Sequence, residues 1–337
     1  MADTVLLSGV SGFLGKHIAL GLLAAGYHVR GSVRAMSKAE QVRAALSRAG
    51  ADIDRLSFVQ LDLSNSAGWD AAAEGCRFIV HTASPVVLTK VKNPQTVVGP
   101  AVAGVRHAIS AGLAAGAERI VLTSSTAAIQ YGHTDPSARL TEANWTDPQS
   151  RRTTTYAASK TLAEREAWRL VDKAGRRSVL SVIHPGVLLG PLLDSHAPTS
   201  AAVVAMLLDG KTPAVPKLSL AMVDVRDVVA LHVDALTNPA AAGQRCIAAV
   251  ETLSLIELAG RLRPLFPDRK LPKAALPDWL VRTVGRFSPE VASVVHELGW
   301  PQNVDGKTGA SRLGRPLIDA STAAEAMGRS LIAFDLL

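Results

Sequence analysis

Cysteine is nearly absent from this chain of 337 residues, which has two, Cys76 and Cys246. Neither lies in a CxxC pair or at metal-ligand spacing from a histidine, which argues against zinc and against a disulfide scaffold. So few thiols fit a reducing compartment. We therefore expect a cytoplasmic protein that binds no metal.

Aromatic residues are also scarce, at 4% of the chain. The chain therefore lacks the stacking surface with which proteins bind single-stranded nucleic acid. The formal net charge is +7, but lysine and arginine are scattered and never form a run of five or more. We expect an ordinary basic surface that attracts an anionic small molecule, and no nucleic-acid partner.

Long apolar runs are missing as well. A strand pattern begins at Thr4, which leaves no room for a signal peptide, and no apolar stretch reaches membrane-spanning length without interruption. With 48% hydrophobic and 19% charged residues, the chain has the composition of a soluble enzyme. We expect no membrane partner, and either a monomer or a homodimer.

The first half of the chain alternates short β-rich runs with amphipathic helical runs. This alternation predicts an α/β fold of the Rossmann type, with a doubly wound parallel sheet whose strand ends bind ligands. Helices are expected to begin near residues 12, 37, 67, 94 and 152. The expected strands are "TVLLS" from Thr4, "HVRGSV" from His28, "LSFVQLD" from Leu56, "FIVHTA" from Phe78, "RIVLTSS" from Arg119 and "SVLSVIHP" from Ser178.

The regular alternation stops after Gly190-Pro191, where prolines become frequent and the helical runs become short. We predict a nucleotide-binding domain over residues 1–190, with residues 221–250 returning to it. Residues 191–220 and 251–337 are expected to form a smaller mixed α/β region that binds substrate.

A glycine turn, "GVSGFLG", lies between the first strand and the first helix. Gly9 permits a tight exit from the strand, Gly12 lets the backbone approach a pyrophosphate, and Gly15 allows close helix packing. The positive end of the helix then favours an anion. The turn therefore predicts a dinucleotide site.

Acidic residues are missing between Asp3 and Glu40, where an NAD-binding fold usually places one to bind the ribose 2′-hydroxyl. Arg34 stands near the end of the second strand instead, with Lys38 four residues later. A guanidinium donates paired hydrogen bonds to a 2′-phosphate, whereas a carboxylate repels it. The predicted cofactor is NADP(H), although both cations also fit the start of a solvated helix.

Further cofactor contacts are expected at the ends of the other strands. Asp62 suits the adenine edge, or alternatively a helix N-cap. Pro185 and the backbone after it suit the nicotinamide carboxamide, and we expect His184 beside it to be a packed or surface side chain and not a base. The full expected set is Gly9, Ser11, Gly12, Phe13, Leu14, Gly15, Arg34, Lys38, Asp62, Leu63, Thr82, Ala83, Ser84, Tyr156, Lys160, Pro185 and Val187.

A tyrosine and a lysine stand four residues apart in "TYAASK", so Tyr156 and Lys160 share one helix face. Hydride reduction of a carbonyl builds charge on oxygen, which calls for a proton donor and a hydrogen-bond donor. Lys160 would lower the pKa of Tyr156, and Ser125 would hold the substrate oxygen, with Ser124 as the alternative. Val86, Ile129 and Leu188 are candidate substrate contacts.

Taken together, the chain resembles an extended short-chain dehydrogenase/reductase of the dihydroflavonol 4-reductase-like group, which includes NADPH-dependent aldehyde and ketone reductases. The resemblance lies in "GVSGFLG", "GSVRAMSK", "VHTASPV", "IVLTSSTAAI", "YAASKTLAEREAW" and "HPGVLLGP". It implies Ser125, Tyr156 and Lys160 as catalytic residues. It also implies Arg34 and Lys38 at the 2′-phosphate, Asp62 at adenine and Pro185 at nicotinamide.

The expected function is therefore an NADPH-dependent carbonyl reductase that is reversible as an alcohol dehydrogenase. The sequence "TTTYAASK" departs from the NWYCYGK type of cinnamoyl-CoA reductases, so a CoA thioester substrate is not implied. The alternatives are a hydroxysteroid-type dehydrogenase, an NAD-dependent sugar-nucleotide epimerase or dehydratase, and a non-catalytic NADP(H) sensor.

Overall fold

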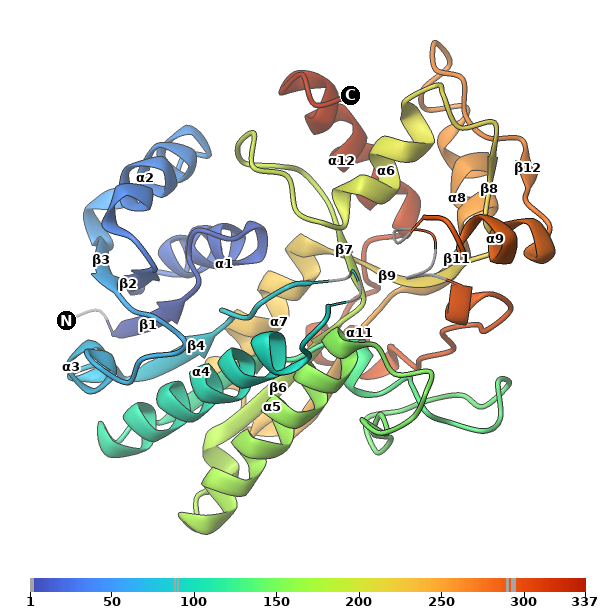
Figure 1. Ribbon diagram of the computed structural model, residues 1–337. Coiled ribbons are helices and arrows are strands. Elements are labelled where there is room, and N and C mark those ends of the chain that lie inside the picture. The colour runs from blue at the N-terminus through green and yellow to red at the C-terminus, as the bar shows by residue number, and fades with distance from the viewer. Residues whose placement is uncertain (1–2, 88, 90, 289–290, 292–294) are drawn as a thin grey trace.

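Seven parallel strands form the central sheet of the computed structural model, which describes residues 3–87, 89, 91–288, 291 and 295–337 (Figure 1). The strand order reverses between β4 and β1, which creates the switch point where such sheets bind ligands. Across the sheet the order is β10 (Arg245–Ala248), β6 (Leu180–Pro185), β5 (Arg119–Thr123), β4 (Phe78–His81), β1 (Thr4–Ser8), β2 (His28–Val33) and β3 (Leu56–Gln60).

Helices cover both faces of this sheet, because successive strand residues are apolar and point to opposite sides. Val5 and Leu7 of β1 join one core cluster, and Leu6 between them joins the other. On the first face lie α1 (Phe13–Ala24), α2 (Ala39–Arg48) and α7 (Val225–Thr237); on the second lie α3 (Trp69–Ala73), α4 (Gln95–Ala114) and α5 (Thr155–Lys173).

The predicted strands and helices agree with those observed to within a few residues. The first five strands begin at their expected residues, and the sixth begins at Leu180 because a 3-10 turn, Arg177–Val179, precedes it. The seventh strand, β10, was expected only as part of a returning segment. It pairs with β6 at the edge of the sheet, where Arg245 faces Val182.

A second, smaller sheet continues from the carboxyl edge of the first. Its order is β11 (Glu251–Ser254), β9 (Ser219–Asp224) and β7 (Val187–Leu189), and β7 follows β6 after a single residue, Gly186. Around it lie β8 (Ala214–Val215), β12 (Ala274–Ala275), α6 (Ala201–Leu208), α8 (Leu255–Leu262), α9 (Asp278–Val284) and α12 (Ala320–Ala333) (Figure 1). Helix α11 (Lys307–Leu313) packs instead against β10 and α7 of the central sheet.

The loop after β7 is fastened to helix α1. The Lys16 ammonium donates to Asp194 at 2.5 Å, and the His17 ring contacts the Pro191 carbonyl at 2.9 Å. The Lys16 side chain is 3% exposed and that of Asp194 is 16% exposed. Since α1 follows the glycine turn, this contact joins the expected cofactor-binding helix to the smaller region.

Helix α4 corrects one sequence-based expectation. It is 20 residues long, and its most apolar 18-residue window has a mean hydropathy of 1.3, so by length and composition it could cross a membrane. Half of its most apolar stretch is buried, and it lies beside α5 against the sheet (Figure 1). A long apolar helix buried in the core of a protein has the same length and composition.

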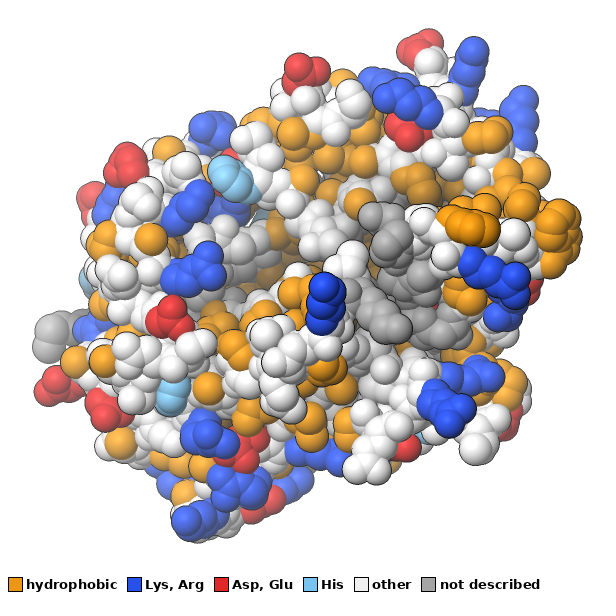
Figure 2. Space-filling model, viewed as in Figure 1, with side chains coloured by type: hydrophobic (Ala, Val, Ile, Leu, Met, Phe, Trp, Pro, Cys, Tyr) orange, Lys and Arg blue, Asp and Glu red, His pale blue; other side chains and the backbone are white. Residues whose placement is uncertain are grey.

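Basic side chains are spread over the face of the molecule that Figure 2 shows. On the face seen in Figure 2, lysine and arginine stand in several separate places among acidic and neutral side chains. Many of the arginines are paired, as Arg77 is with Asp3 and Glu118. This pattern matches the expected ordinary basic surface.

Candidate active site

The glycine turn has the close backbone packing that its sequence predicts. Gly9 has φ +76°, and a Cβ on it would lie 2.9 Å from the backbone of Ala83. A Cβ on Gly15 would lie 2.1 Å from the carbonyl oxygen of Gly9. Side chains are therefore excluded at both positions, one facing strand β4 and the other inside the turn.

The start of helix α1 suits an anion. Gly12 is its N-cap, no side chain caps its first turn, and that turn carries no acidic residue. The backbone N–H groups and the helix dipole at such an end favour a phosphate. Ser11 and Gly12 are exposed, whereas Phe13, Leu14 and Gly15 are buried and anchor the helix.

Ser8 ties the glycine turn to the end of strand β4. Its hydroxyl accepts hydrogen bonds from the Thr82 and Ala83 backbone amides and contacts His81 at 2.8 Å. The Thr82 hydroxyl returns a bond to the Ser8 carbonyl at 2.7 Å. These four residues form one edge of the predicted cofactor site, and Ser84 follows, half-buried.

Arg34, Lys38 and Asp62 stand at the neighbouring strand ends, and all three are exposed. Arg34 directly follows β2, while Lys38 donates to the side chain of Gln41 at 3.2 Å. Asp62 accepts from the Ser64 amide at 2.6 Å, which makes it the cap of a local turn, and α3 begins after Gly68. Leu63 packs against Gly104 of helix α4.

Ser125, Tyr156 and Lys160 come together from two elements. Tyr156 and Lys160 lie on the first two turns of α5, and Ser125 follows strand β5. A hydrogen bond joins the side chains of Tyr156 and Ser125. The Lys160 ammonium, 7% exposed, donates to the carbonyl of Thr123 at 3.1 Å.

The two neighbouring serines have different partners, which the sequence left open. The Ser125 hydroxyl contacts Tyr156 and accepts from the Ala127 amide at 3.1 Å. The Ser124 hydroxyl points to the other side and donates to Glu164 at 2.6 Å. Ser125 is thus the serine on the side of the tyrosine.

The electrostatics differ from the expected effect of Lys160 on Tyr156. Burial raises the pKa of the Tyr156 phenol, and the hydrogen bond from Ser125 opposes this rise. Burial also lowers the pKa of Lys160 to about 8, against the attraction of Glu164. The lysine directs its ammonium to a backbone carbonyl, so the tyrosine remains a protonated phenol at neutral pH.

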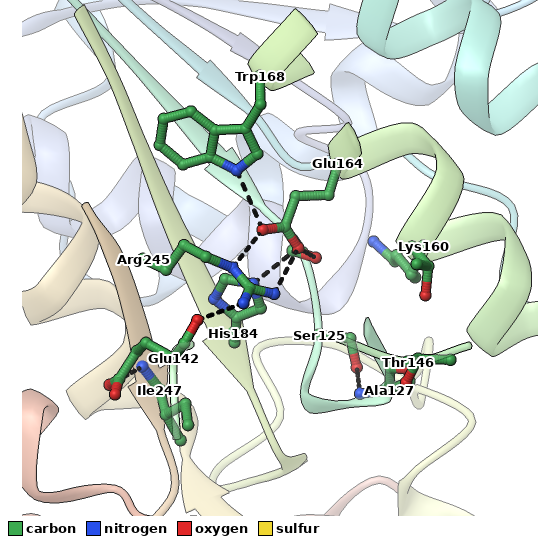
Figure 3. A network of polar contacts seen from close by, with 12 residues as sticks. Ser125, Ala127, Glu142, Thr146, Lys160, Glu164, Trp168, His184, Arg245 and Ile247 are labelled. Carbon is green, nitrogen blue, oxygen red and sulfur yellow. Dashed lines mark hydrogen bonds and ion pairs between the residues drawn. The ribbon is translucent and has the colours of Figure 1, made fainter. Parts of the chain in front are cut away.

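A buried carboxylate behind these residues was missed by the sequence analysis. Glu164, 1% exposed, contacts His184 and Arg245 at 2.7 Å each (Figure 3). Its spacing, four residues after Lys160 on the same helix face, was the available signal. His184 itself is fully buried, as expected of a packed histidine.

Tyr131 is a second neighbour of the tyrosine that the sequence did not suggest. It interacts electrostatically with Tyr156, and its hydroxyl donates to Glu297 at 2.5 Å. Glu297 in turn accepts from Gln302 at 2.8 Å. Residues from the C-terminal third of the chain therefore reach this side of the site.

The expected substrate contacts differ in how exposed they are. Val86 is 52% exposed and Leu188 is half-buried, so both have free surface. Ile129 is fully buried in an apolar cluster with Leu140, Ala221, Ile247 and Ala249. Ile129 therefore has no exposed surface in this structure, and its contact with substrate stays a prediction. Pro185 is buried at the end of β6, and Val187 after it is half-buried.

Residues 5–248 match the model of the NAD dependent epimerase/dehydratase family. Tetraketide alpha-pyrone reductase 2 of Arabidopsis thaliana is 35% identical over 78% of this chain and 83% of that protein. Cinnamoyl-CoA reductase 1 of Oryza sativa subsp. japonica is 36% identical over 78% of this chain and 76% of that protein.

Solved structures share the fold over nearly the whole chain. Yeast methylglyoxal/isovaleraldehyde reductase Gre2, complexed with NADPH, has a TM-score of 0.81 at 24% identity and covers 98% of this chain and 99% of its own. Vestitone reductase from alfalfa has a TM-score of 0.78 at 23% identity, with 99% of each chain covered.

Proposed function

The chain belongs to the NAD dependent epimerase/dehydratase family of extended short-chain dehydrogenases/reductases, and on that premise we propose that it reduces an aldehyde or ketone to an alcohol with NADPH. The observation that carries the proposal is the convergence of Ser125, Tyr156 and Lys160 on one side of a glycine turn built for an anion. The relatives named above are reductases as well.

The residues present fit a phosphorylated dinucleotide. Gly9 and Gly15 allow the close backbone packing of the turn, which leaves no room for a Cβ, and the start of α1 has no side-chain cap among the described residues. Arg34 is an exposed cation at the end of β2, where a carboxylate would select the unphosphorylated ribose. We therefore assign Arg34 and Lys38 to the 2′-phosphate.

The cofactor, when bound, supplies a hydride to the carbonyl carbon. Ser125 donates a hydrogen bond to the carbonyl oxygen and so stabilises the charge that develops there. Tyr156 transfers its phenolic proton to this oxygen, which completes the alcohol. Lys160, one helical turn away, stabilises the phenolate that remains.

Burial keeps the donor in the right state for reduction. Because the pKa of Tyr156 is raised, the phenol carries its proton throughout the neutral range. Lys160, with a pKa of about 8, is mostly charged at neutral pH and loses its charge above that value. We therefore expect carbonyl reduction to slow in alkaline solution.

The substrate is proposed as a small carbonyl compound, and a thioester is the second candidate. The 36% identity to a cinnamoyl-CoA reductase favours testing thioesters, although "TTTYAASK" departs from the sequence typical of those enzymes. A screen of NADPH oxidation should therefore compare aldehydes, diketones, keto esters, cyclic ketones and cinnamoyl-CoA.

The deciding variant is Tyr156→Phe. We expect kcat for the best substrate to fall about 10²- to 10⁴-fold, because the proton donor is lost, while NADPH still binds. NADPH binding can be followed by its fluorescence. Full turnover by the variant would overturn the proposal. A wild-type protein that binds NADPH and turns over no carbonyl would favour a sensor, and tightly held NAD on purification would favour an epimerase.

A further inference from the structure

Glu164 occupies an unusual place for a charged side chain. It lies on α5 one turn beyond Lys160, so Tyr156, Lys160 and Glu164 follow one another on a single helix face. The residue is 1% exposed. Burying a carboxylate is costly unless hydrogen bonds and opposite charges compensate it, so its partners are informative.

Four side chains bind this carboxylate. Oε2 accepts from the Ser124 hydroxyl at 2.6 Å and contacts Nε2 of His184 at 2.7 Å. Oε1 accepts from Nε of Arg245 at 2.7 Å and from the Trp168 indole at 3.3 Å. Figure 3 shows Glu164 among Trp168, His184 and Arg245, with Lys160 and Ser125 nearby.

Two of these partners are chain neighbours of residues in the proposed site. Ser124 directly precedes Ser125 after strand β5, and His184 directly precedes Pro185 at the end of β6. One carboxylate therefore connects the helix of the tyrosine and lysine with two strand ends. A displacement of the carboxylate would change the separation between Ser125 and Tyr156.

Arg245 fastens the other side of the network. Its guanidinium donates to the carbonyls of Glu142 and Asn144 and lies 3.9 Å over the Trp145 ring. Glu142 in turn accepts from the Ile247 amide of β10 at 3.0 Å. The arginine is thus held by several groups and presents a fixed positive charge to Glu164.

We propose that Glu164 is a positioning residue for the proposed reduction: its buried carboxylate holds α5, the end of β5 and the end of β6 in register, and so fixes Lys160 and Tyr156 relative to Ser125. The inference rests on the proposed function for its effect on turnover. Its effect on Lys160 can be measured without turnover.

The charge of Glu164 also bears on Lys160. Burial opposes its ionisation, but His184 and Arg245 together lower the pKa of Glu164 to about 2, so it is an anion at every working pH. Burial lowers the pKa of Lys160 to about 8, and the negative charge of Glu164 opposes this decrease. Removing the negative charge should therefore let Lys160 lose its proton at lower pH.

Other groups around Lys160 do not account for such a change. Tyr156 on the same helix has a raised pKa, and His81 at the end of β4 has a pKa lowered to about 3 by burial and by the nearby Lys160. His81 is therefore neutral through the alkaline range. His184 from β6 and Arg245 from β10 face Glu164.

The test compares Glu164→Gln and Glu164→Asp with Glu166→Gln. Glu166 is on the same helix, where its carboxylate pairs with Arg106 and Arg169 at the surface. For Glu164→Gln we expect kcat to fall roughly 10- to 100-fold with little change in the KM for NADPH, since about 1 Å of misplacement costs that much. Glu164→Asp, which keeps the charge, should recover part of kcat, and Glu166→Gln should behave as wild type.

The pH profile is the readout that a merely structural role would not move. In Glu164→Gln the alkaline fall of kcat should shift to lower pH by roughly one unit. In Glu164→Asp and Glu166→Gln it should stay in place. An unchanged kcat and an unchanged profile in folded Glu164→Gln would overturn the inference.

Two further measurements apply if Glu164→Gln does not fold or if the protein shows no turnover. If Glu164→Gln does not fold, Ser124→Ala removes a single hydrogen bond to the carboxylate and should lower kcat by roughly 3- to 10-fold. Direct titration of ¹⁵N-labelled Lys160 by NMR, with and without Glu164→Gln, does not need a substrate. A shifted Lys160 titration in a protein without turnover would refute the proposed function alone, whereas an unshifted one would refute the role of Glu164.

Discussion

At the scale of single residues, the direction of the side chain decides which of Ser124 and Ser125 contacts Tyr156. They are adjacent in a short extended stretch, so their side chains point to opposite sides. One hydroxyl meets Tyr156 and the other meets Glu164. Sequence alone identified the pair but left the choice open, because the direction depends on how β5 meets the next loop.

At the same scale, we predict that Arg34 makes the protein prefer NADPH to NADH. Arg34→Ala should lower kcat/KM for NADPH roughly 10- to 100-fold, the loss expected for a charge-assisted hydrogen bond to phosphate. The value for NADH should stay within about threefold, because NADH has no 2′-phosphate to bind. Steady-state kinetics with both cofactors checks this.

Arg55→Ala is the matched control for that measurement. Arg55 is partly exposed and pairs with Asp52. It precedes β3, so it lies at the amino ends of the strands, whereas Arg34 lies at their carboxyl ends. Its removal should leave the preference for NADPH unchanged. Equal use of NADH and NADPH by the wild type, unaltered in Arg34→Ala, would contradict the assignment of the 2′-phosphate.

The residues found from sequence are those whose role follows from position along the chain. The glycine turn and the Tyr156–Lys160 spacing are local patterns, and both could be read directly. The spacing of Glu164 placed it on the helix face of Lys160, but its buried partner Arg245, 81 residues away, could not be inferred from the sequence. The full burial of Ile129 could not be predicted either, because it arises from contacts with Ala221 and Ile247, far along the chain.

At the scale of elements, the first six strands of the central sheet were predictable from the sequence and the seventh, β10, was not. The first five strands are apolar runs bounded by turn residues. This pattern is typical of parallel strands that are buried on both faces. Strand β10 has four residues, "RCIA", and stands at the edge of the sheet. Its pairing with β6 is a long-range contact that its own sequence does not encode.

The contact between α1 and the loop after β7 gives the element-scale prediction. Asp194→Ala leaves the buried ammonium of Lys16 without its partner, which should lower the free energy of unfolding by about 3 kcal/mol. The double variant Lys16→Met, Asp194→Leu should recover most of this loss, because neither charge remains. Urea unfolding of the two variants checks both statements.

An Asp194→Ala variant as stable as the wild type would show that Lys16 finds other partners at no cost. Arg329→Ala is a suitable control. It removes a surface ion pair with Glu325 of α12, where the arginine side chain is 63% exposed. Such a pair should contribute less than about 1 kcal/mol.

At the scale of the whole molecule, buried histidines make stability depend on pH. Burial lowers the pKa of His17 and of His232 to about 4, and that of His81 to about 3. Histidine in an unfolded chain has a pKa near 6.5. Below that pH these three histidines bind protons in the unfolded state but remain neutral in the folded state. Stability is therefore full above pH 6.5 and is lost as the pH falls toward 4.

The expected loss is large enough to measure. Summed over the three histidines, the free energy of unfolding should fall by about 5 kcal/mol between pH 7 and pH 5. His232→Gln should reduce this difference by about a third, whereas His28→Gln, at an exposed position, should leave it unchanged. Urea midpoints at constant m-value provide the measurement, and a flat profile from pH 7 to 5 would rule the explanation out.

The route of the chain between the two sheets limits how the protein can be recombined with its relatives. After β6 the chain runs directly into β7 of the small sheet, and later returns through α7 to supply β10 beside β6. A chimera cut at a single junction near residue 190 would receive β10, and with it the arginine that neutralises Glu164, from the foreign parent. Exchange of substrate range between two such enzymes therefore calls for at least two crossover points, one on each side of the returning segment.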